Sequence, residues 1–504
     1  MKKSRILFIT PNLKGIADGV NRIQPSLGLM LIAPILENAG HIVKIYDAAL
    51  EGWSHQTIIN KENNMVMIGQ PDDILASVIS DFAPDIVAIS VLFSNLMESA
   101  HNIAKITKKV NPSVTVILGG NHISSAVTDY LYAKNDINTF LPNYIEDLDD
   151  TNIDLAMTGE GEFSFLDLVN AITNKTSIDK IPGLVKKIGY RKYIINPNVR
   201  IMDLNELPRP GRHLVNMEGY FEIGAFHSPK SRSKRVLSVM CSRGCPEKCT
   251  FCSTPQMWGQ KVRWRSTEHI MDEIINDVRD FKIGELQFED DTITANRKNL
   301  FALCTELEKL GLPWCTPNGT KVNYHFNKQD EMYERMFNAG CYQITLACES
   351  GVQRVLDEII HKRLPLDTIY PSIAAAKKAG MLVHTFWILG YPGETYEEMQ
   401  KTIDFAMNSG ADSFSFSILS PLPGTPIYRK VHDENLWWGG RGIDDILWRS
   451  SLIKVDGFDN PLEFEKFVSE ANTKANLLLE KNNPERFKYK YGEDADQSSF
   501  VKQT

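Results

Sequence analysis

Short apolar runs alternate with amphipathic stretches along the first third of the chain. The amphipathic stretches at 26–39, 72–82 and 96–110 have the spacing of helices. Buried apolar strands that alternate with helices predict a parallel, doubly wound α/β sheet. The predicted strands are residues 6–9, 43–46, 86–90, 114–118 and 154–157.

Polar and glycine-rich turns follow these strands. Ligands of such sheets bind outside the carboxyl ends of the strands, so the turns are the candidate binding site. A nicotinamide cofactor is disfavoured because no G-x-G-x-x-G follows the first strand, and a Gly-Gly pair alone is more often a tight turn. The candidate residues are Asn12, Ser94, Gly119, Gly120, His122, Gly159, Glu160, Gly161 and Glu162.

The strand–helix alternation stops near residue 180 and resumes at 236. Six further strand units predict an open (β/α)6 barrel, because a full (β/α)8 barrel needs two more units. Residues 181–235 are expected to form an extended linker, and residues 431–504 a small helical C-terminal extension with one helix near 461–481. The predicted domains are therefore 1–180, 181–235, 236–430 and 431–504. The predicted barrel strands are 236–240, 285–289, 314–322, 342–346, 383–389 and 413–420.

Composition restricts the class of protein. A net charge of −8 argues against nucleic acid as a general partner. No apolar run reaches the roughly 18 residues of a membrane span, and the apolar run at the start is too short for a signal peptide. All eight cysteines lie between residues 241 and 348, which predicts one metal-centred domain in the reducing cytoplasm.

Cys245, Cys249 and Cys252 form a C-x3-C-x2-C motif directly after the first barrel strand. Three thiolates can hold three irons of a [4Fe–4S] cluster and leave the fourth iron open to a small molecule. The alternatives are a cluster that serves only electron transfer and a zinc knuckle completed by Cys241. The other four cysteines lack ligand spacing and are expected to pack as small apolar residues.

This motif is identified as the signature of the radical SAM superfamily, in which the open iron binds S-adenosylmethionine (SAM). The first domain resembles the cobalamin-binding domain of class B members through residues 25–29, 90–94, 119–122 and 159–162. The chain lacks the D-x-H-x-x-G motif of the classical B12 mutases. The resemblance therefore implies cobalt without a protein histidine ligand, with His122 as a wall or tail contact.

The same resemblance implies roles for residues at the ends of barrel strands. Asp290 and Asp291 are expected to bind the SAM ammonium, Glu349 its ribose, and the backbone of Gly390 its adenine. The alternatives are a helix cap for Asp291, a solvated loop for the carboxylates, and a simple turn at Gly390.

Five segments between residues 220 and 356 resemble the cobalamin-dependent radical SAM C-methyltransferases of the kind found in fosfomycin biosynthesis. The segments are 220–223, 258–261, 311–314, 316–320 and 349–356. The resemblance implies methyl transfer from methylcobalamin to an unactivated carbon through a 5′-deoxyadenosyl radical. The alternatives are a cobalamin-binding radical SAM cyclase or ring-rearranging enzyme, and a non-catalytic corrinoid and Fe–S protein.

The expected partners are a small anionic substrate, phosphonate- or nucleotide-like, and an electron donor such as flavodoxin or ferredoxin. Arginine suits phosphate because its guanidinium donates two parallel hydrogen bonds. Four cations near the motifs are candidates for the anion site: Arg263, Arg265, Lys362 and Arg363.

Overall fold

The computed structural model describes residues 2–17, 19, 21–61, 64–135, 144–190, 192–228, 231–447, 449–482 and 484; the side chains of 133–135 and 144–146 are excepted. The chain divides into two compact units, residues 1–225 with 256–258 and residues 226–255 with 259–504. The four domain ranges given above remain predictions. The end of the predicted tail, after about Asn482, lies outside the described residues apart from Pro484.

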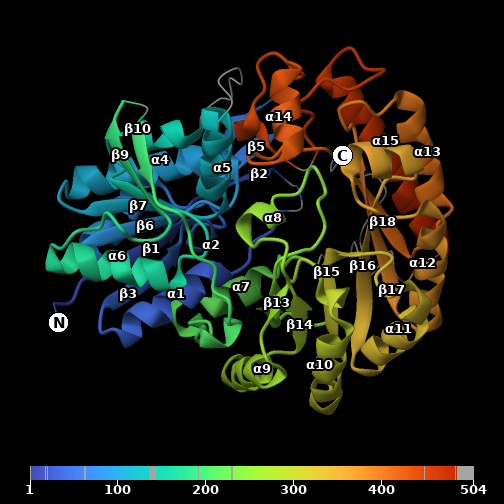
Figure 1. The fold of residues 1–504 in the computed structure, drawn as a ribbon, viewed down its shortest axis with the longest axis horizontal. Coiled ribbons are helices and arrows are strands. Elements are labelled where there is room, and N and C mark those ends of the chain that lie inside the picture. The colour runs from blue at the N-terminus through green and yellow to red at the C-terminus, as the bar shows by residue number, and fades with distance from the viewer. Residues whose placement is uncertain are drawn as a thin grey trace. The chain divides into compact units, whose positions relative to one another are not determined.

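The first unit contains the predicted doubly wound sheet (Figure 1). Its parallel strands are ordered β3-β1-β6-β7-β8, so the chain reverses direction across the sheet between β1 and β6. This reversal is the topological switch point, where such sheets bind ligands. The strands are β1 (Arg5–Thr10), β3 (Ile42–Asp47), β6 (Ile86–Ser90), β7 (Thr115–Gly119) and β8 (Leu155–Met157).

Helices cover both faces of this sheet. Successive strand residues point to opposite faces, so Phe8 packs in one core and Ile9 in the other. Helices α1 (Leu27–Asn38) and α6 (Glu162–Asn174) cover the face of Phe8. On the face of Ile9 lie α3 (Asp72–Phe82), α4 (Met97–Val110) and α5 (Asn121–Asn135).

Short strands of mixed polarity were not predicted. The expected linker instead contains the hairpin β9 (Leu184–Gly189) and β10 (Lys192–Ile195), which extends the sheet beyond β8, and α7 (Met217–Ile223). A separate antiparallel sheet is formed by β2 (Leu13–Ile16), β5 (Met65–Ile68) and β4 (Gln56–Asn60). All five residues of β4 are exposed, so its sequence has no buried face to reveal it.

The second unit contains six parallel strands in sequence order, as the (β/α)6 prediction requires (Figure 1). Helices α9 (Thr267–Phe281), α10 (Arg297–Leu310), α11 (Gln329–Asn338), α12 (Ile369–Lys378) and α13 (Tyr396–Met407) alternate with them. The strands are β11 (Val236–Val239), β14 (Glu285–Phe288), β15 (Trp314–Lys321), β16 (Cys341–Glu349), β17 (Leu382–Leu389) and β18 (Ser413–Ile418).

Two parts of this unit differ from a regular repeat. The helix predicted at 352–360 contains a π-helix, Val355–Ile360, a form that often occurs at functional sites. After β18 come α14 (Pro426–Asp433) and α15 (Pro461–Asn482). Asn472 of α15 binds the backbone of Phe416 on both sides, at 3.0 and 2.9 Å, which fixes α15 against the edge strand β18. No helix in the described ranges is long and apolar enough to cross a membrane.

Gly120 is predicted to be irreplaceable, whereas its neighbour Gly119 is not. Gly120 has φ +103°, and a Cβ there would lie 2.4 Å from the Val91 carbonyl oxygen; at Gly119 the nearest atom would be 3.9 Å away. Gly120→Ala is expected to lower the free energy of unfolding by roughly 2–4 kcal/mol, from backbone strain and the clash. Gly119→Ala is the matched control. Urea unfolding of the apoproteins tests this, and equal losses in both variants would contradict it.

Candidate functional site

The three motif cysteines lie in a loop that is closed at its base. β12 (Ser242–Arg243) pairs antiparallel with β13 (Arg263–Trp264) on either side of the loop. Gly244, with φ +103°, begins the turn, and the Cys245 amide donates to the Gly259 carbonyl at 3.2 Å. The motif is visible in the sequence, but the β12–β13 ribbon that fixes both ends of the loop was not predicted.

Thr250, next to Cys249, is held on three sides. Its amide donates to Ile360 O at 3.0 Å and its hydroxyl to Ile359 O at 2.7 Å. Its carbonyl accepts from the amide of Ile427 at 3.1 Å. The π-helix and the start of α14 therefore fix the loop between the second and third cysteines.

Glu247, between the first two cysteines, ties the loop to a second strand end. Its carboxylate lies 2.9 Å from Lys321 Nζ and 3.0 Å from an Arg363 nitrogen, and accepts from the Tyr324 hydroxyl at 3.1 Å. Burial alone would raise the pKa of Glu247, but the Lys321 and Tyr324 hydrogen bonds outweigh it and lower that pKa. This cluster was not predicted from the sequence, although Glu247 and Thr250 lie inside the motif.

The ligand requirement of an iron–sulfur cluster differs from that of a single metal ion. No set of three or more His, Cys, Asp or Glu side chains in the described part of the chain is placed to hold one metal ion. A [4Fe–4S] cluster differs because each thiolate binds its own iron. Burial raises the pKa of Cys245 to about 12 and that of Cys249 to about 11, so they are thiols until iron displaces their protons. Cys241 is fully buried and close to Asp290.

Asp290 and Asp291 have different surroundings. Asp290 is buried, and its two oxygens accept from the Cys241 amide and the Ser242 hydroxyl. Asp291 accepts from the Thr254 hydroxyl at 2.8 Å, and Thr254 also hydrogen-bonds Cys252. Burial raises the pKa of Asp290 to about 7 and that of Asp291 to about 6. Asp290 therefore holds the start of the loop, whereas Asp291 lies beside the thiols.

Glu349 and Lys362 form a buried pair near Cys249. Glu349 ends β16 in the left-handed region, with φ +68°, and binds Lys362 Nζ at 2.7 Å. The neighbours of Lys362, His361 and Arg363, are left-handed as well. Single left-handed residues cost about 1–2 kcal/mol each, so the fold maintains this turn against strain.

Gly390 follows β17 with φ +86°, and its amide donates to Glu394 Oε2 at 2.8 Å. A Cβ at Gly390 would lie 2.7 Å from the Phe464 ring of α15. Burial raises the pKa of Glu394 to about 8. The amide of Gly390 is thus used within the turn, and the glycine is needed for close packing.

The expected anion site is not supported by its cations. Arg265 binds Glu273 at 2.6 Å, Lys362 binds Glu349, and Arg363 binds Glu247. Arg263 is buried and has interactions of its own. Three of the four cations already face a carboxylate of the chain, and their role in an anion site stays a prediction.

The switch point of the first unit has features that suit cobalamin. Asn12 follows β1; its side-chain nitrogen donates to Gln70 O at 2.9 Å, while its buried oxygen has no hydrogen-bond partner. After β6, Leu92 is 49 % exposed and Phe93 41 % exposed. A corrin ring is a flat macrocycle fringed by amides, so exposed apolar side chains and an unpaired amide oxygen after neighbouring strands match its chemistry.

His122 is engaged by its own domain at both ring nitrogens. Nδ1 lies 2.9 Å from the Ser94 hydroxyl, and Nε2 lies 2.8 Å from Asp147. Asp147 also binds His101, and this hydrogen bond raises the pKa of His101 to about 9, against burial and with help from Asp150. Neither ring nitrogen of His122 is left for cobalt, in keeping with the missing D-x-H-x-x-G.

The remaining predicted turn is largely structural. A side chain at Gly159 would be strained, because its φ is +72° and a Cβ would lie 2.6 Å from Asn198 Nδ2. Glu160 accepts from the Ile201 amide at 2.8 Å. Gly161 and the buried Glu162 begin α6. Glu160 therefore uses its carboxylate to fix the segment that contains Ile201.

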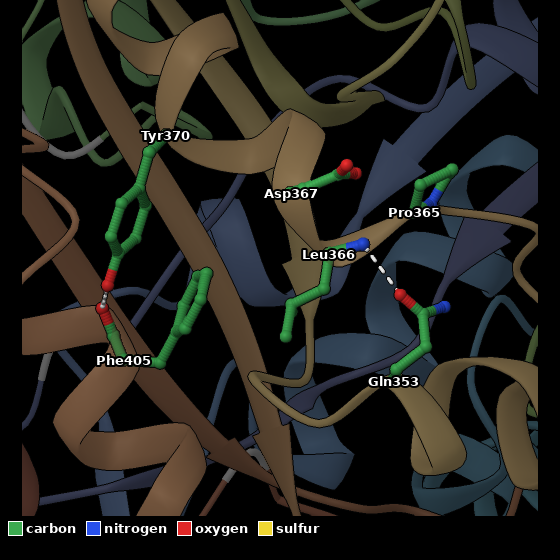
Figure 2. A pocket seen from close by; sticks show the side chains of 6 residues that line it. All are labelled: Gln353, Pro365, Leu366, Asp367, Tyr370 and Phe405. Carbon is green, nitrogen blue, oxygen red and sulfur yellow. Dashed lines mark hydrogen bonds between the residues drawn. The ribbon is translucent and has the colours of Figure 1, made fainter.

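Two surface hollows contain none of the predicted site residues. One, of about 540 Å³, is lined by Gln353, Pro365, Leu366, Asp367, Tyr370 and Phe405 (Figure 2). There Gln353 accepts from the Leu366 amide at 2.7 Å and Tyr370 donates to Phe405 O at 2.9 Å. The other, of about 390 Å³, includes the turn 311–313 at the amino end of β15. The first is lined mainly by the connection between β16 and α12, and the second lies away from the carboxyl ends of the strands, where barrel chemistry is placed.

Two protein families match the two units. The Radical SAM superfamily matches residues 239–406, and the B12 binding domain matches residues 13–141. A solved structure of the radical S-adenosylmethionine methyltransferase TsrM from Kitasatospora setae, with cobalamin and a [4Fe–4S] cluster bound, has the same fold. It matches at TM-score 0.63 and 15% identity over 86% of this chain and 78% of that one.

The chain is 31% identical to cytidylyl-2-hydroxyethylphosphonate methyltransferase from Streptomyces wedmorensis, over 93% of this chain and 89% of that protein. It is 25% identical to an anaerobic magnesium-protoporphyrin IX monomethyl ester cyclase from Rubrivivax gelatinosus, over 85% of this chain and 70% of the relative. The chain therefore belongs to the cobalamin-dependent radical SAM methyltransferases, whose cofactors are a [4Fe–4S] cluster, SAM and cobalamin.

Proposed function

We propose that this enzyme methylates an unactivated sp3 carbon of a small anionic metabolite, phosphonate- or nucleotide-like. The radical chemistry in this proposal is supported by the loop of Cys245, Cys249 and Cys252, which hydrogen bonds and ion pairs pin to the surrounding strand ends and helices. The name of the Streptomyces wedmorensis relative supports the anionic substrate. When bound, the cluster and SAM supply a 5′-deoxyadenosyl radical, and cobalamin supplies the methyl group.

In this proposal Cys245, Cys249 and Cys252 bind three irons. Asp291 binds the SAM ammonium, supported by its position beside Thr254 and the thiols. Glu349 binds the ribose with the oxygen that Lys362 leaves available. Asp290 acts one step away, by holding Cys241 and Ser242 at the start of the loop.

The same proposal assigns cobalamin to the switch-point edge. Asn12 Oδ1 would accept from an amide of the corrin, and the open space beside Gly119 would let the cofactor approach the chain closely. Ser94 and His122 form the supporting wall beneath these contacts. An electron donor such as flavodoxin or ferredoxin and a cytoplasmic location complete the proposal.

A cyclase or ring-rearranging enzyme is the second candidate. The 25% identity to the Rubrivivax gelatinosus cyclase favours it, because that relative matches over 85% of this chain. The two candidates differ in product: only the methyltransferase adds the mass of a methyl group.

Replacing any motif cysteine is expected to abolish the cluster and SAM cleavage, because each thiolate holds one iron. Cys241→Ala is the matched control in the same segment and is expected to keep about four irons per chain. Iron analysis and 5′-deoxyadenosine formation after anaerobic reconstitution measure both. Loss of the cluster in the Cys241→Ala variant would show that the assigned ligand set is wrong.

Cob(II)alamin bound to the protein is expected to have no histidine nitrogen on cobalt, because both nitrogens of His122 are engaged. Electron paramagnetic resonance of protein made with ordinary and with [15N]histidine tests this. The two spectra are expected to coincide. A splitting that changes with the label and disappears in His122→Ala would make His122 the ligand.

Incubation with cytidylyl-2-hydroxyethylphosphonate and SAM carrying a CD3 group tests the reaction. The expected product is heavier by one CD3 in place of hydrogen, with S-adenosylhomocysteine and 5′-deoxyadenosine formed alongside it. Cys252→Ala is the control for background chemistry. A substrate isomerised without gain of mass would favour the ring-rearranging candidate, and no reaction would contradict the phosphonate assignment.

A further inference from the structure

Three consecutive carboxylates follow β14, and the first of them, Glu289, has none of the roles described above. Its side chain is 8% exposed, and its Oε2 lies 2.8 Å from His227 Nδ1. The side-chain amide of Asn318 donates to the backbone carbonyl of Glu289 at 2.8 Å. Its other carboxylate oxygen, Oε1, is buried and has no hydrogen-bond partner in the protein.

The other polar residues on this face of β14 are satisfied by the chain itself. Side chains two residues apart share a face of a strand, so Glu285, Gln287 and Glu289 form one row. Gln287 accepts from the Ser228 amide at 3.1 Å, and Glu285 accepts from Tyr342 OH at 2.8 Å and from the amides of Arg232 and Ser233. Within this row, Glu289 Oε1 alone is left unpaired, at the carboxyl end of the strand.

We infer that Glu289 Oε1 accepts a hydrogen bond from a substrate hydroxyl beside the carbon that is methylated. A buried acceptor without a donor costs stability, so the unpaired oxygen points to a ligand that supplies the donor. A carboxylate can only accept, which requires a donor on the substrate. The charge of Glu289 already faces His227, so the donor can be a neutral hydroxyl.

The position of Glu289 favours a contact with the reacting end of the substrate over a contact far from the cluster. It lies at the carboxyl end of a barrel strand, two residues before Asp291, which lies beside Thr254 and the cysteines. A hydrogen bond that draws the hydroxyl proton places negative charge on oxygen and weakens the adjacent C–H bond. The contact therefore strengthens toward the transition state, as a catalytic contact must.

This inference names the substrate class of the proposed reaction, an alcohol, and rests on that proposal. The probes are cytidylyl-2-hydroxyethylphosphonate and cytidylyl-ethylphosphonate, which lacks the hydroxyl. Anaerobic holoenzyme is expected to bind the alcohol about ten- to hundredfold more tightly, as for a hydrogen bond to a charged group. Glu289→Ala and the nearly isosteric Glu289→Gln are expected to lose most of this preference.

Glu285→Gln is the matched control, because Glu285 lies in the same row and is satisfied within the protein. It is expected to keep the preference. SAM affinity is measured in parallel, and is expected to fall in Asp291→Asn but not in Glu289→Gln. Equal binding of both probes by the unaltered enzyme, or a preference kept in both Glu289 variants, would overturn the inference. Loss of SAM affinity in Glu289→Gln would overturn it too, by assigning Glu289 to SAM.

If neither probe binds, the phosphonate assignment fails while the hydroxyl site is decided separately. A crystal structure of the substrate-free holoenzyme then shows the partner of Oε1. An ordered water there would support a donor-binding position, since water would occupy the place of the hydroxyl. A protein donor on Oε1 would overturn the inference whatever the substrate.

Discussion

The second unit depends on one constraint: a loop without regular structure must hold three thiols at fixed positions. The chain meets it by attaching the loop to the strand ends around it. Thr250 is bound to the π-helix and to α14, Glu247 to the end of β15, and the start of the loop to Asp290 after β14. Buried hydrogen bonds of this kind restrict motion strongly because breaking one leaves an unsatisfied group.

The same constraint divides the acidic residues at the strand ends into two kinds. Asp290 and Glu247 use both of their oxygens on the protein, and they position the loops. Asp291 and Glu289 lie at the same end of β14, but Glu289 keeps an oxygen that the fold leaves unpaired. An oxygen that the chain leaves unpaired therefore marks a carboxylate as a candidate ligand, whereas a fully paired carboxylate serves the fold.

The fold was largely predictable because its signals are local. The apolar strands of both units and the helices 267–281 and 297–310 follow from hydrophobic period and from caps such as Ser266 and Asn296. The exposed strand β4 and the hairpin β9–β10 have no such period. The three cysteines were proposed as ligands from their spacing alone. The pairing of Lys362 with Glu349, by contrast, joins residues 13 apart in a turn where Glu349, His361 and Arg363 are left-handed. No sequence pattern predicts that geometry, which is why Lys362 was assigned to a substrate together with Arg263, Arg265 and Arg363.

The central claim is that the pinned loop holds a cluster whose fourth iron is open to SAM. The most direct measurement is the electron paramagnetic resonance spectrum of the reduced, reconstituted protein with and without SAM. SAM is expected to shift the g-values of the cluster, and Asp291→Asn is expected to weaken this effect. A spectrum unchanged by saturating SAM would show that no iron is open, and it would contradict the account.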